Sequence, residues 1–196
     1  MYSIYGLKWK QQTHRYVIII LSVFMLNEII GVISSLNFFT FKINVTITTI
    51  IHTILWLLIL KKSARFPRRI TGFLIVFVTF SFCDLFFIEG WKLFNCYSFV
   101  LGSFMYLIVF LMESFYQLKK ENFPFFFSNQ FILLMAPVLF FIGLTFMLGF
   151  KSHEIITTVF FGKLVLYKTI NIIVNIVYYT LLNIYIYREK KKLYDF

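Results

Sequence analysis

Six long apolar runs constrain the fold of this 196-residue chain more than any other feature. A helix needs about 20 mostly apolar residues to cross a bilayer, and each run approaches or exceeds that length. The runs are Tyr16–Phe39, Ile43–Leu60, Ile70–Glu89, Cys96–Gln117, Phe131–Phe150 and Lys168–Tyr187. The sequence therefore predicts an all-α fold, a polytopic transmembrane helix bundle with six spans.

The composition leaves no room for a soluble domain. Hydrophobic residues make up 60% of the chain and charged residues only 14%, whereas soluble domains are about 45–50% apolar and about 25% charged. A globule of this size cannot bury the excess, so lipid must solvate it. We expect one integral membrane domain over residues 1–196. The abundance of Phe, Ile, Asn, Lys and Tyr is typical of an AT-rich genome. The expected location is the bacterial inner (plasma) membrane.

Lysine and arginine are distributed unevenly between the two sets of helix ends. One set carries Lys8, Lys10, Arg15, Lys61, Lys62, Arg65, Arg68, Arg69, Lys119, Lys120, Arg188, Lys190, Lys191 and Lys192. The other set carries Lys42, Lys92, Lys151, Lys163 and Lys168. Because basic loops stay in the cytoplasm, both termini are predicted to be cytoplasmic. The net charge of +11 is thus a topology signal, and we expect the lipid bilayer, not nucleic acid, as partner.

The most basic connection follows the second run. It contains Lys61, Lys62, Arg65, Arg68 and Arg69. Such a cluster can act simply as a stop-transfer anchor, or it can bind anionic lipid headgroups. Both interpretations stay open at this point.

Glu28 lies near the middle of the first run. A carboxylate at that depth costs about 2.5–3.5 kcal/mol on insertion scales, so it needs a partner or a function. His52 lies at a matching depth in the second run, and sequential helices joined by short loops are antiparallel neighbours. We therefore expect a contact between Glu28 and His52. Trp56, near the cytoplasmic end of the same run, is interpreted as an interfacial anchor.

Further polar groups interrupt the other runs. They predict a polar cavity in the outer half of the bundle, although the same groups could merely hold helices together through hydrogen bonds. The ligand-binding or proton-relay candidates are Glu28, His52, Asp84, Tyr106, Glu113, Asn171 and Asn175. The fifth run has no ionisable residue and contains Pro137, so we expect that helix to face lipid or to have a structural role.

Short segments along the chain resemble a group of small six- to seven-helix membrane proteins of Bacteroidota. The segments are Asn27–Gly31, Ile51–Trp56, Phe94–Ser98, Tyr116–Asn122 and Ile170–Asn175. Members of that group often carry another helix before the Asn-Glu segment. The resemblance implies either a six-helix variant or a sequence that starts late, and it implies no particular activity.

Three functions remain open. The polar midplane favours a ligand-binding, sensing or transport-type bundle. The absence of any output domain favours a scaffold or subunit of a larger membrane complex, with a membrane-protein partner or a second copy. A membrane-embedded lipid hydrolase or lyase would use Glu28 or Asp84 as general acid or base beside His52. No catalytic, metal-ligand or cofactor pattern occurs in the sequence, so we expect neither metal nor cofactor.

Overall fold

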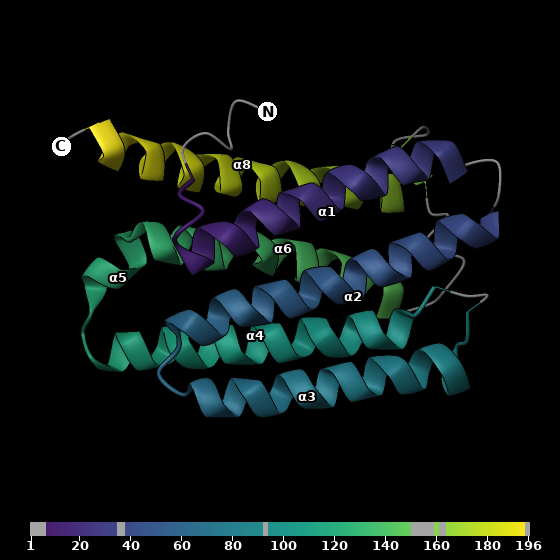
Figure 1. Ribbon diagram of the computed structural model, residues 1–196, viewed down its shortest axis with the longest axis horizontal. Coiled ribbons are helices and arrows are strands. Elements are labelled where there is room, and N and C mark those ends of the chain that lie inside the picture. The colour runs from purple at the N-terminus through teal and green to yellow at the C-terminus, as the bar shows by residue number, and fades with distance from the viewer. Residues whose placement is uncertain (1–6, 35–37, 92–93, 150–158, 161–163, 195–196) are drawn as a thin grey trace. The chain divides into compact units, whose positions relative to one another are not determined.

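The structure is a computed structural model that describes residues 7–34, 38–91, 94–149, 159–160 and 164–194 (Figure 1). Within those residues, six helices are long and apolar enough to cross a membrane. This finding confirms the predicted all-α fold with six spans. The chain divides into two compact units, Lys8–Val109 and Phe110–Phe196 with Met1–Leu7.

The unit Lys8–Val109 is built from four helices and one π-helical turn. These are α1 (Gln12–Ser34), α2 (Phe38–Ser63), α3 (Pro67–Cys83), the turn η2 (Asp84–Ile88) and the first half of α4 (Cys96–Lys119). α3 begins with a proline, whose fixed φ angle and missing N–H suit the first turn of a helix. α2 packs against both α1 and α3, so it lies at the centre of this unit (Figure 1).

Gly102 lets α4 approach the other helices of this unit closely. A Cβ atom at Gly102 would lie 2.6 Å from both the Phe77 ring on α3 and the Thr53 methyl on α2. Helices in lipid associate through such close packing, because apolar surface gains nothing by leaving lipid for protein. Gly102, Phe77 and Thr53 are all buried. The contact therefore sets the distance between α4 and its neighbours.

The second unit contains the rest of α4, the short helix α5 (Phe123–Phe127), α6 (Asn129–Gly149) and α8 (Leu166–Tyr194). α6 and α8 pack side by side (Figure 1). The rings of Phe140 and Tyr178 meet in their interface at 5.5 Å between centroids. A Cβ atom at Gly143 would lie 2.5 Å from Val174, so glycine again permits the close approach.

A short antiparallel ladder precedes α8. It pairs β1 (Val159–Phe160) with β2 (Leu164–Val165), so that Val159 faces Val165 and Phe160 faces Leu164. The apolar pattern alone did not predict this ladder. Each strand has two residues, and the architecture is otherwise helical.

The predicted spans coincide with the helices, and the differences are confined to the residues at which the spans begin and end. α8 continues to Tyr194, well beyond the predicted end of the sixth span at Tyr187. The predicted positions 35–37 and Phe150 lie outside the described residues.

The fifth span was expected to face lipid or to have a structural role, and its burial favours the structural role. In α6, 44% of the span is buried, compared with 11% in α1. α6 lacks ionisable groups because it packs its apolar and small side chains against α8 and α5. The absence of charge is therefore a mark of the protein interior as much as of a lipid-facing surface.

The packing at Gly102 makes a testable prediction. Gly102→Ala should lower the melting temperature in detergent, because overpacking a close contact costs about 1–3 kcal/mol. Gly72→Ala is the matched control, since a Cβ atom there meets nothing within 4 Å and alanine favours helix over glycine by about 1 kcal/mol. Equal melting temperatures for the two variants would contradict the packing described.

Candidate functional site

The Asp84 carboxylate is fully buried where η2 meets the start of α4. Its Oδ2 accepts hydrogen bonds from the backbone N–H of Ser98 at 3.0 Å and from the Ser98 hydroxyl at 2.6 Å. Ser98 belongs to the first turn of α4, whose N–H groups have no partner within the helix. The carboxylate therefore caps α4 from another helix, and its negative charge suits the positive end of the α4 dipole.

A second carboxylate supports the same helix end. Glu89 Oε2 accepts the N–H of Tyr97 at 3.1 Å. Thr46 on α2 adds a weaker contact, because its hydroxyl accepts the N–H of Asn95 at 3.4 Å. The start of α4 is thus held by side chains from two other elements.

Asp84 and two residues that lie three positions before Asp84 and three before Ser98 in the chain carry buried polar atoms without partners. Among the residues that the structure describes, Asp84 Oδ1, Ser81 Oγ and both amide atoms of Asn95 have no hydrogen-bond partner. Ser81 and Asp84 are three residues apart along α3 and η2, so they lie on one face. Buried polar groups without partners cost about 1–3 kcal/mol each and call for an explanation such as a bound water or ion. We call these three residues the Asp84 cluster.

The helix geometry changes at the same place. η2 is a π-helical turn that begins at Asp84. Single π turns within α-helices are rare and occur frequently at functional sites. The change in backbone geometry therefore coincides with the unsatisfied carboxylate oxygen.

His52 is buried at the centre of α2 and bonds within that helix. Its Nε2 accepts the indole N–H of Trp56 at 2.7 Å, which requires the proton of a neutral imidazole to sit on Nδ1. The Phe24 ring of α1 packs edge-on against the imidazole at 4.7 Å. Trp56 is 0% exposed and contacts the ring of buried Tyr106. The interpretation of Trp56 as an interfacial anchor was therefore wrong.

Glu28 does not contact His52. Its side chain is exposed, and it forms no hydrogen bond or ion pair with any of the described residues. α1 instead turns Phe24 and Asn27 toward α2, where the Asn27 Oδ1 accepts bonds from Asn44 at 2.7 Å and from Thr48 at 3.2 Å. The prediction placed the wrong face of α1 inward, because α1 is apolar all round and has no face marked by its sequence.

The remaining candidates lie in the second unit or at its edge. Glu113 is buried and accepts a hydrogen bond from the Gln117 amide one turn later, at 2.7 Å. Asn175 donates to both the backbone oxygen and the side-chain Oδ1 of Asn171, at 2.8 and 2.9 Å. The amide of Asn175 is thus bonded within α8, one turn from its own position.

The basic connection after α2 is mostly exposed. Lys62, Arg65, Arg68 and Arg69 are exposed, and Lys61 is half-buried. Arg65 and Arg69 lie over the ring of Phe66, at 4.9 and 4.7 Å from its centroid. Lys92, Lys151 and Lys163, predicted on the opposite set of helix ends, fall outside the described residues.

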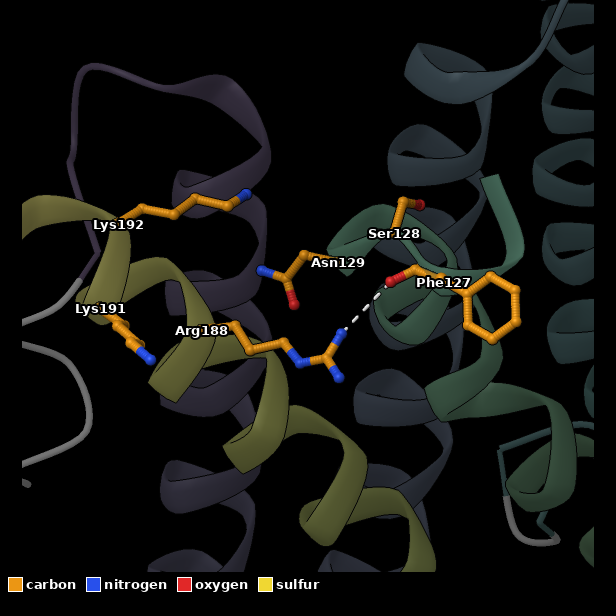
Figure 2. A pocket seen from close by; sticks show the side chains of 6 residues that line it. All are labelled: Phe127, Ser128, Asn129, Arg188, Lys191 and Lys192. Atoms are coloured by element: carbon orange, nitrogen blue, oxygen red, sulfur yellow. Dashed lines mark hydrogen bonds between the residues drawn. The ribbon is translucent and has the colours of Figure 1, made fainter. Parts of the chain in front are cut away.

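Sequence reasoning missed a pocket in the second unit. The pocket has a volume of about 510 Å³ and is lined by Phe127, Ser128, Asn129, Arg188, Lys191 and Lys192 (Figure 2). The sequence had shown its three cations only as topology signals. A basic residue repeated at three- to four-residue spacing along the end of a helix is the pattern that could have indicated it.

These features define the class of the protein. The six helices make the chain a multi-pass helical membrane protein with buried polar groups in its interior. No protein family matches the chain, and no curated protein or solved structure shows significant similarity to it.

The bond between Trp56 and His52 predicts a measurable coupling. Trp56→Phe keeps the ring but removes the N–H donor, so it should destabilise the protein by about 1–3 kcal/mol. In a double-mutant cycle with His52→Phe, the two changes should be non-additive by about 0.5–1.5 kcal/mol. Unfolding in detergent measures both values. The control is Trp91→Phe, at an exposed tryptophan. Strictly additive effects of Trp56→Phe and His52→Phe would refute the bond.

Proposed function

We propose that the protein is a ligand-binding or transport-type membrane bundle whose polar centre is the Asp84 cluster. The observation that carries this proposal is the fully buried Asp84 carboxylate, with one oxygen satisfied by Ser98 and the other without a partner among the described residues. An ionisable group within a membrane span is expensive to keep, and such groups commonly mark ligand, ion or proton pathways.

The chemistry of the cluster favours a small cation or a hydrogen-bond donor as ligand. The unsatisfied atoms include a carboxylate oxygen on Asp84, a hydroxyl oxygen on Ser81 and an amide oxygen on Asn95. Hard alkali and alkaline-earth cations prefer oxygen ligands of this kind. A proton carried by water or by the carboxylate itself would satisfy the same groups.

Membrane location and orientation belong to this proposal. The asymmetric distribution of lysine and arginine supports cytoplasmic ends for both termini and insertion in the inner membrane. Accessibility labelling of single cysteines placed at Lys10 and Lys190, in intact cells and in lysed cells, measures that orientation directly.

The described contacts do not favour an enzyme. A hydrolase or lyase would need an acid or base beside a partner group, within about 2.6–3.2 Å of it. Glu28 is exposed, His52 bonds to Trp56, and the Asp84 carboxylate bonds to Ser98. No two of these three candidates contact one another through the described side chains.

Asp84→Asn tests the proposed function. Asparagine can still accept the hydrogen bonds from Ser98, so the fold should persist, while the charge at the unsatisfied oxygen is lost. In proteoliposomes, the wild type should support flux of Na⁺, K⁺ or H⁺ down an imposed gradient, read with ion- and pH-sensitive dyes. We expect Asp84→Asn to reduce that flux at least tenfold.

The matched control is Glu89→Gln, which removes the other carboxylate at the start of α4. It should retain the flux, because Glu89 lies outside the Asp84 cluster. Flux that is equal in wild type and Asp84→Asn, or no response to any of the three cations in flux or in thermal stability, contradicts the proposal.

Glu28 favours a second candidate, a subunit of a larger membrane assembly. Its carboxylate lies on an exposed face of α1 beside exposed Met25, Ile29 and Val32. A charge on an apolar membrane surface is costly unless a cation on another chain or copy meets it. The proposal of a partner rests on that charge.

Glu28→Gln should therefore change the assembly and leave the fold intact. We expect a complex purified in mild detergent to shift toward the monomer in native mass spectrometry. The melting temperature of the monomer should change little, because Glu28 makes no described contact. An oligomer distribution identical to that of the wild type would count against this candidate.

A further inference from the structure

The pocket of the second unit brings two distant segments together at one end of their helices. Phe127, Ser128 and Asn129 lie where α5 ends and α6 begins, while its three cations come from the end of α8 (Figure 2). The span in α6 starts at Asn129 and the span in α8 ends at Lys192. The pocket therefore lies at the end of two membrane spans, at the depth of lipid headgroups.

The lining of this pocket is positively charged. Among the described residues, the lining contains Arg188, Lys191 and Lys192 and no acidic residue. Lys192 pairs with Glu189 at 2.9 Å, whereas Arg188 and Lys191 form no ion pair within the described part of the chain. The Arg188 guanidinium is directed toward the pocket by a hydrogen bond to the backbone oxygen of Phe127, at 3.3 Å (Figure 2).

The two walls of the pocket are tied together. Asn129 is buried, and its amide donates to Glu189 Oε1 at 2.6 Å and to the backbone oxygen of Tyr185 at 3.1 Å. The first residue of α6 is thereby fixed against α8. The cations need little rearrangement to receive an anion, and the N-terminal end of α6 adds a favourable partial charge.

The neighbouring helix α5 points to a membrane lipid as the source of that anion. Its sequence, Phe-Pro-Phe-Phe-Phe, divides into two faces. Phe125 and Phe126 pack on Phe131, at 5.5 and 5.1 Å between ring centroids. Phe123 and Phe127 are 58% and 81% exposed. Exposed aromatic side chains beside lysine and arginine are typical of segments that lie in the headgroup region.

We propose that this pocket binds the phosphate group of an anionic glycerophospholipid, with Arg188 and Lys191 as its main ligands. Guanidinium and ammonium groups recognise phosphate through charge-assisted hydrogen bonds. Phe127 inserts beside the acyl chains of the bound lipid. The site is distinct from the basic connection after α2 and does not depend on the function proposed for the Asp84 cluster.

The test compares lipids on the purified full-length protein in detergent. Phosphatidylglycerol should remain bound in native mass spectrometry and raise the melting temperature, while phosphatidylcholine should do neither. Arg188→Gln combined with Lys191→Gln should weaken phosphatidylglycerol binding about 25-fold, since each basic residue near an anionic headgroup contributes about a fivefold gain in affinity. Melting without lipid checks that the double variant is folded.

The control is Lys8→Gln combined with Lys10→Gln, which removes the same charge from two exposed residues that precede α1. It should bind phosphatidylglycerol like the wild type. Equal losses in both double variants, or equal binding of the two lipids by the wild type, overturn the proposal. Two further measurements distinguish a membrane lipid from free phosphate as the source of the anion: the effect of inorganic phosphate on the wild type, and lipid binding by Phe127→Ser. The lipid assignment is also overturned if inorganic phosphate raises the melting temperature as much as phosphatidylglycerol does. It is likewise overturned if Phe127→Ser binds phosphatidylglycerol as well as the wild type.

Discussion

The bonds from Ser98 to Asp84 join the end of α3 and its π turn to the start of α4. A helix that starts inside a membrane protein leaves several N–H groups without partners, and lipid cannot supply any. The Asp84 carboxylate supplies one acceptor, Glu89 another and the Thr46 hydroxyl a third. Close packing at Gly102 then carries α4 past α2 and α3. The arrangement of this unit depends on the capping of the start of α4 and on the absence of a side chain at Gly102 in the same helix.

The number and type of spans could be predicted from sequence because the membrane imposes one length and one composition on each helix. The face that each helix turns toward its neighbours could not be predicted. In α1 the apolar residues surround the helix, so nothing in the sequence distinguishes Asn27, which bonds to α2, from Glu28, which is exposed. Hydropathy reports how deep a residue lies, and rotation about the helix axis is set by packing that involves other segments.

Two candidate residues bond to side chains that the sequence analysis did not name as their partners. His52 has its partner at Trp56, one turn along the same helix, a spacing that the sequence displays. Asp84 has its partner fourteen residues away across a connection, at a serine that no local pattern marks. The pocket at the end of α8 was not recognised from the sequence either. In the sequence, Arg188 and Lys191 indicate only topology. The pocket becomes visible in the structure, where the start of α6 forms its second wall.

Oδ2 of Asp84 accepts a hydrogen bond from the first turn of α4, while Oδ1 is buried without a partner among the described residues. The two oxygens share one delocalised charge, so a proton or cation held at Oδ1 withdraws electron density from Oδ2 and weakens the cap. By thermodynamic linkage, a weaker cap must in turn favour occupancy of Oδ1. Under the proposed function, the order of the first turn of α4 would therefore depend on what the carboxylate holds.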